Sequence, residues 1–105
     1  MKEDRILVII KNPGEEPRVE PSFDNTLEAL QAAVGGYIET ITLCCDFCLV
    51  INEEGRLKGL PYNTTVCGLP IVGPIVAVGV KGDELCSIKS ASVPFVLQML
   101  RRKDD

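Results

Sequence analysis

Two cysteines separated by two residues are the first candidates for chemistry in this chain. Cys45 and Cys48 form a CxxC pattern, and Cys44, Cys67 and Cys86 complete the five cysteines. A structural zinc site usually takes four ligands from two such pairs, and a redox CxxC lies between a strand and a helix. Here the pattern occurs once, within a predicted hairpin. We therefore predict no metal site, and we keep a thiol-dependent enzyme or a zinc-binding protein that uses Cys45 and Cys48 as the alternative.

General acid–base chemistry has few candidates. The chain contains no histidine, which removes the commonest general base and the Ser–His and Cys–His dyads. Glu53 and Glu54 are neighbours in a predicted turn, so their side chains diverge instead of sharing a proton. Gly35 and Gly36 follow a predicted helix, whereas a phosphate-binding loop precedes one. We predict no catalytic residue and no cofactor, so an enzyme is the less favoured class.

Four polar residues beside glycine and proline turns are the candidate ligand-binding residues. These are Tyr37, Asn52, Tyr62 and Asn63. Tyrosine and asparagine side chains fix ligands in small pockets and also anchor protein interfaces. The alternative interpretation is that the tyrosines are half-buried in the core and that the asparagines form turns.

Strands are predicted from apolar runs between turns. Residues 5–10 and 75–80 are rich in β-branched residues and typical of strands buried on both faces. Residues 37–43 and 46–51 predict a hairpin through Cys44 and Cys45. The remaining predictions are an edge strand or extended connector at 17–21, at most a short strand at 56–58, and a strand at 85–88.

Two helices are predicted from apolar spacing and capping. Asn25 is the expected N-cap of the first, whose apolar face includes Leu30 and Val34 and which ends at Gly35. The second covers the last apolar stretch, from Val93 onward, with Ser90 or Ser92 as the expected cap and Pro94 in its first turn. The predicted fold is α+β: a mixed, mainly antiparallel sheet of about five or six strands with two helices packed on it.

Length and charge restrict the class further. A chain of 105 residues predicts a single domain, residues 1–105. The net charge of −4 disfavours direct nucleic-acid binding, which needs clustered Lys and Arg. The apolar run at residues 6–10 is too short for a signal peptide or a membrane span, so we predict no membrane partner and a cytoplasmic location. Sheet edges of this kind are often covered by a second copy, which makes a homodimer an expectation.

Two longer patterns carry a family resemblance. Residues 26–39 read TLEALQAAVGGYIE and residues 52–63 read NEEGRLKGLPYN. They resemble an uncharacterised family of small proteins known as a domain of unknown function, DUF3846. Residues 11–17 match its opening turn, and the resemblance covers most of residues 5–80. The chain departs from the family pattern in the short segment between Asn63 and Ile71 and at Cys44 and Cys45.

The resemblance implies a context without an activity. The family is met in bacteria, often gut Firmicutes, and in their phages and mobile elements. The leading interpretation is therefore a small cytoplasmic binding module of phage or mobile-element type that binds a small ligand or a host protein. An acidic decoy of a nucleic-acid-binding protein is the weaker alternative.

Overall fold

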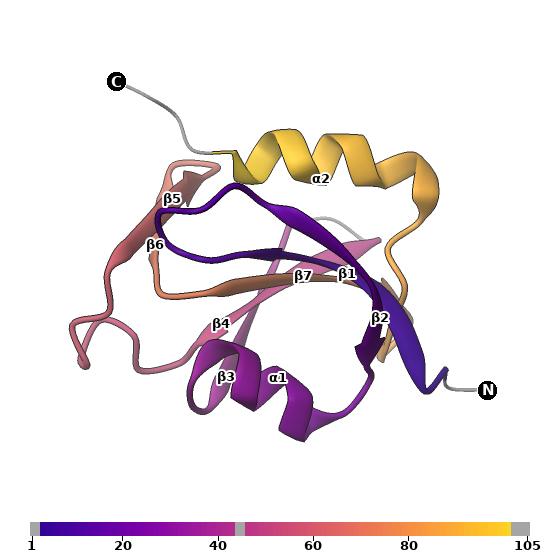
Figure 1. The fold of residues 1–105 in the computed structure, drawn as a ribbon, viewed down its shortest axis with the longest axis horizontal. Helices are drawn as coiled ribbons and strands as arrows, with labels where there is room; N and C mark the ends of the chain where they lie inside the picture. Colours follow the sequence, from indigo (N-terminus) through magenta and orange to yellow (C-terminus); the bar gives the residue numbers. More distant parts are fainter. Residues whose placement is uncertain (1–2, 44–45, 102–105) are drawn as a thin grey trace.

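Three continuous apolar strands form the middle of the fold in this computed structural model, which describes residues 3–43 and 46–101 (Figure 1). They are β1 (Arg5–Lys11), β4 (Phe47–Asn52) and β7 (Ile75–Lys81). Each is buried along most of its length, as expected for strands covered on both faces. The other elements are β2 (Arg18–Asp24), α1 (Leu27–Val34), β3 (Ile38–Thr42), β5 (Tyr62–Val66), β6 (Leu69–Val72), β8 (Glu84–Cys86), a 3-10 turn η1 (Ser90–Ser92) and α2 (Val93–Leu100).

The main sheet has six strands in the order β2-β1-β7-β4-β3, with β8 paired to β7. Its strand pairs are antiparallel throughout the described ranges. β3 and β4 pair as the predicted hairpin strands, and the predicted link at Cys44 and Cys45 lies outside the described residues. Residues 17–21, predicted as an edge strand or extended connector, fall mostly in the edge strand β2. The expected α+β fold, with a mainly antiparallel sheet and two helices, is therefore confirmed.

The two helices cover opposite faces of this sheet (Figure 1). Successive side chains of a strand point to opposite faces. Ile9 and Leu49 accordingly pack on the α2 side, and Ile10 and Val50 on the α1 side. The α2-side core consists of Ile9, Phe47, Leu49, Val66, Ile71, Ile75, Ala77, Ile88, Val96 and Leu100. The α1-side core consists of Ile6, Val8, Ile10, Leu30, Val34, Cys48, Val50, Val76 and Val78.

A second, two-stranded sheet was not predicted. β5 and β6 form an antiparallel hairpin whose Val66 and Ile71 belong to the α2-side core. The turn between them consists of Cys67 at φ 51° and Gly68 at φ 79°. Two successive positive φ angles define the type I′ turn that suits tight hairpins. Residues 56–58, expected to be at most a short strand, lie in a turn, and β8 is shorter than the predicted strand at 85–88.

The helix ends correct the capping prediction for α1 and confirm the predicted cap position of α2. Thr26 is the N-cap of α1, and its side chain accepts a hydrogen bond from the Ala29 amide at 3.1 Å. Asn25, the predicted cap, is buried and donates elsewhere. Ser92 is the N-cap of α2 but makes no capping side-chain bond, because its backbone is already in the helical region. Pro94 lies in the first turn as predicted. No helix in residues 3–43 and 46–101 is long and apolar enough to cross a membrane.

Candidate functional site

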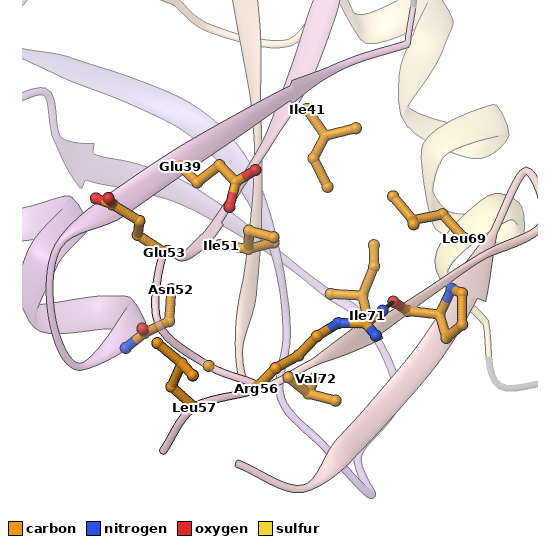
Figure 2. A pocket seen from close by; sticks show the side chains of 12 residues that line it. Glu39, Ile41, Ile51, Asn52, Glu53, Arg56, Leu57, Leu69, Ile71 and Val72 are labelled. Carbon is orange, nitrogen blue, oxygen red and sulfur yellow. Dashed lines mark hydrogen bonds between the residues drawn. The ribbon is translucent and has the colours of Figure 1, made fainter. Parts of the chain in front are cut away.

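A cleft opens between the β3–β4 end of the main sheet and strand β6 of the hairpin (Figure 2). We call it the β3–β6 cleft, and its cavity volume is about 200 Å³. It is lined from four segments: β3, β4, the turn that follows β4, and β6. The lining residues are Glu39, Ile41, Ile51, Asn52, Glu53, Gly55, Arg56, Leu57, Leu69, Pro70, Ile71 and Val72.

The β3–β6 cleft combines apolar and charged side chains. Isoleucines from both sheets line it, namely Ile41, Ile51 and Ile71. Two carboxylates, Glu39 and Glu53, and the Arg56 guanidinium lie among the labelled side chains of Figure 2. Charged groups and apolar side chains therefore line one cavity, a combination typical of a binding site for an amphipathic group.

Arg56 joins two walls of the β3–β6 cleft. Its Nη2 atom donates a hydrogen bond to the Pro70 carbonyl oxygen at 2.9 Å, so the turn after β4 is tied to β6. Leu57, the next residue, is 88% exposed. The turn therefore holds the arginine against the hairpin and leaves the leucine in solvent.

Asn52 fixes the turn that carries Arg56 and Leu57. Asn52 is buried, and its Nδ2 atom donates to the Val34 carbonyl at 3.0 Å. Its Oδ1 atom accepts from the Glu54 amide at 2.8 Å. The side chain thereby satisfies a carbonyl in the last turn of α1, which has no intrahelical partner, and orders the start of residues 53–59.

The glycine that follows α1 makes room for this amide. A Cβ atom on Gly36 would lie 2.9 Å from Asn52 Nδ2 and 3.0 Å from Lys58 Nζ. The Glu53 amide then donates to the Tyr37 carbonyl at 2.9 Å. The two sequence patterns at residues 26–39 and 52–63 therefore meet at Asn52. The first pattern contributes Gly36 and the Tyr37 carbonyl to this junction, and the second contributes the Asn52 side chain and the Glu53 amide.

Asn63 fixes the position of the β5–β6 hairpin, whose strand β6 forms one wall of the cleft. It is 1% exposed, and its Nδ2 atom donates to the carbonyls of Lys11 at 2.7 Å and Gly73 at 2.8 Å. These contacts tie β5 to the end of β1 and to the segment that leads into β7. Asn63 Oδ1 is buried and has no hydrogen-bond partner within the described residues.

The structure does not bring the four predicted binding residues into one cavity. Asn52 lines the β3–β6 cleft, but its amide is engaged within the chain. Tyr62 and Asn63 line a second cavity of about 310 Å³, beside Pro13 and Gly14. Tyr37 is exposed and lines neither of these two cavities. Tyr62 is also exposed, and its hydroxyl lies 2.7 Å from the Thr65 hydroxyl.

Of the residues that line the cleft, only Asn52 was predicted from the sequence to bind a ligand. The missed residues include Glu39, Arg56 and Leu57. Arg56 and Leu57 belong to the pattern NEEGRLKG, in which the polar Asn52 beside a turn was the predicted binding residue. A large apolar residue in a turn of charged residues was the signal that could have identified Leu57. The β6 wall had no such signal, because the hairpin itself was not predicted.

The thiol alternative rests on Cys45 and Cys48, of which the structure describes only Cys48. Cys45 lies outside the described residues. Cys48 is buried in β4 on the α1 side, and burial raises the pKa of its thiol above the ordinary value of 9.0. Its reactive thiolate form is therefore less available than that of an exposed cysteine. No group of three or more His, Cys, Asp or Glu side chains suited to a metal ion occurs in residues 3–43 and 46–101.

Fold and site together define an α+β domain with two faces, one of which carries a small amphipathic cleft. The chain belongs to the family described as Domain of unknown function (DUF3846), which matches residues 4–101. No curated protein and no solved structure matches it.

Proposed function

We propose that this protein is a non-enzymatic protein-binding module whose β3–β6 cleft accepts a bulky apolar side chain of its partner. The observation that carries the proposal is Leu57. A leucine that is 88% exposed in a turn has little packing role in the chain itself. Leu69, also exposed, lines the same cleft. Exposed apolar residues rimmed by charges are typical of interaction sites.

The size of the cleft favours a side-chain anchor. Pockets for drug-sized molecules measure about 300–1,000 Å³ and enclose most of the ligand. The β3–β6 cleft measures about 200 Å³. A cavity of this size suits one aromatic or large aliphatic residue, and such residues supply much of the affinity of protein interfaces.

The charges at the cleft favour a basic neighbour for that anchor. Glu39 and Glu53 both line the cleft, whereas the Arg56 guanidinium is held by Pro70. The chain as a whole carries a net charge of −4. We therefore expect the partner segment to carry Lys or Arg next to its apolar residue, which would favour encounter and orientation.

The wider context stays a proposal. The family resemblance supports a phage or mobile-element module acting on a host protein in the cytoplasm. The alternative, a thiol-dependent enzyme or zinc-binding protein using Cys45 and Cys48, is less favoured for Cys48, because burial disfavours its thiolate. A small ligand is the competing occupant of the cleft.

The test is a selection of displayed random peptides on the folded protein. We expect enriched peptides to share a bulky apolar residue beside a basic one. Leu57→Asp and Glu39→Lys should each weaken their binding at least about tenfold, consistent with loss of an interface anchor or a charge pair.

Leu27→Asp is the matched control. Leu27 is an exposed leucine at the start of α1, and α1 packs on the face of the sheet opposite to the one on which Ile41 and Ile71 of the cleft lie. This substitution should leave peptide binding unchanged. The proposal fails if no sequence converges, or if the selected peptides bind the Leu57→Asp and wild-type proteins equally well.

A further inference from the structure

The two long edges of the main sheet are built differently. Edge strand β2 contains Pro21 and carries the ion pair between Arg18 and Glu20, and Asp24 at its end pairs with Arg5 of β1. The pairing of β2 with β1 also shifts register between Ile6 and Val8. Proline, charges and irregular pairing are devices that prevent an edge from adding another strand.

Edge strand β3 carries only one of these protections along its five residues, the charge of Glu39. It reads Ile-Glu-Thr-Ile-Thr, without proline or a basic residue, and four of the five are β-branched. Its register with β4 is regular from Ile38 to Thr42. Glu39, Thr40 and Thr42 are exposed. β3 is therefore a regularly paired strand with strong β-propensity at an open edge.

The backbone groups at this edge can be assigned from the register. The Glu53 amide donates to the Tyr37 carbonyl, which continues the β3–β4 ladder by one pair. Hydrogen-bonded and non-hydrogen-bonded pairs alternate along an antiparallel ladder. The residues that bond to β4 are therefore Glu39 and Ile41. The N–H and C=O groups of Ile38, Thr40 and Thr42 point to the open edge, where the described chain places no other strand.

We propose that β3 pairs with β3 of a second copy, antiparallel and centred on Thr40, so that two main sheets form one continuous sheet. In this register Thr40 faces its own counterpart on the two-fold axis, and Ile38 faces Thr42. Glu39 faces Ile41 instead of another carboxylate. A register centred on Glu39 would place like charges directly opposite, which is unfavourable.

The pairing would also complete the β3–β6 cleft. Glu39 and Ile41 line the cleft from β3. In the dimer, Glu39 of the second copy lies beside Ile41, on the same face of the sheet. Each cleft then gains a carboxylate from the other copy, and the two clefts lie on either side of the two-fold axis. The dimer itself does not depend on what the cleft binds.

The experiment measures solution mass by light scattering after gel filtration. The wild-type protein should have twice the chain mass of 11.4 kDa. Thr40→Lys and Thr40→Glu should each be monomeric, because like charges would meet on the two-fold axis. An equal mixture of the two variants should recover the dimer mass, since opposite charges then face each other. Circular dichroism should show both variants folded, because Thr40 is exposed.

Ser22→Lys is the matched control, because it adds the same charge at an exposed position of the protected edge β2 and should leave the dimer intact. Three results would overturn the proposal: a monomeric wild-type protein, a Thr40→Lys variant that stays dimeric, or a mixture that fails to recover the dimer. If the wild-type edge instead binds a different protein, the chain alone is monomeric, and the first result is obtained.

Discussion

Buried asparagine side chains hold together segments that are distant in the sequence. Asn25 donates to the carbonyls of Glu3 and Leu85 at 3.0 and 3.1 Å, so it joins the N-terminal segment to β8. Asn52 joins α1 to the turn after β4, and Asn63 joins the hairpin to β1 and to the segment before β7. An amide offers two donors and an acceptor in a compact group, which lets one side chain satisfy several buried backbone atoms.

Substitution of Asn63 tests this role. Asn63→Ala would leave the buried carbonyls of Lys11 and Gly73 without their donor, so we expect a loss of about 2–4 kcal/mol in the free energy of unfolding. Asn63→Asp should cost more at neutral pH, because a carboxylate would face two carbonyl oxygens. Urea unfolding followed by circular dichroism measures both. Asn12→Ala, which removes an exposed amide contact to Glu15, is the control and should change stability by less than about 0.5 kcal/mol.

Cys48 gives a pH dependence of known sign. Burial raises the pKa of its thiol in the folded state above 9.0, so the folded protein retains the proton where the unfolded chain has lost it. The free energy of unfolding therefore falls as the pH rises above about 9. Cys48→Ala removes this contribution, and the stability difference between wild type and variant should shrink from pH 8 to pH 10. A difference that stays constant over this range would show that the thiol is not perturbed by folding.

For single residues, the sequence predicted position beside a turn better than it predicted burial and contacts. Asn52 and Asn63 were identified as polar side chains beside rigid turns, and both lie beside such turns. Their burial was not visible, because the carbonyls that they bind come from Val34, Lys11 and Gly73, far away in the sequence. Leu57 shows the converse, since an apolar residue that looks like core lies in solvent.

At the scale of elements, periodic patterns were reliable and the β5–β6 turn was not. The long strands followed from continuous apolar runs, and both helices followed from apolar spacing and capping residues. The hairpin turn uses Cys67 at a positive φ angle, whereas Asn-Gly and Asp-Gly are the usual signals for such a turn. The sequence Cys-Gly therefore did not predict a hairpin. Strand β6, which forms one wall of the β3–β6 cleft, was not predicted either.

A substitution at Cys67 in the β5–β6 turn should stabilise the folded protein. Cys67 is exposed and has φ 51°, a conformation that asparagine tolerates better than most residues. Cys67→Asn should raise the free energy of unfolding by about 0.5–1 kcal/mol, and Cys67→Val should lower it, because a β-branched side chain clashes at positive φ. Thermal unfolding of the three proteins in parallel measures the order. Equal stability of the Asn and Val variants would contradict the turn assignment.

For the whole molecule, the decisive feature is that both cores rest on the same strands. β1, β4 and β7 each give alternate side chains to the α1 side and to the α2 side. Loss of either core exposes one face of strands that the other core needs. We therefore expect the two faces to unfold in a single transition, as small domains usually do.

The two tyrosines make this expectation measurable, because the chain has no tryptophan. Tyr37 follows α1, and Tyr62 begins β5 of the hairpin on the opposite face. Tyr62→Phe leaves Tyr37 as the only fluorescent reporter, and Tyr37→Phe leaves Tyr62. Both side chains are exposed, so neither change should alter stability by more than about 0.5 kcal/mol. Fluorescence and circular dichroism should then give the same urea midpoint in both variants. A lower urea midpoint for Tyr62 fluorescence than for circular dichroism in the Tyr37→Phe variant would mean that the hairpin separates first. The β3–β6 cleft would then open before the main sheet unfolds.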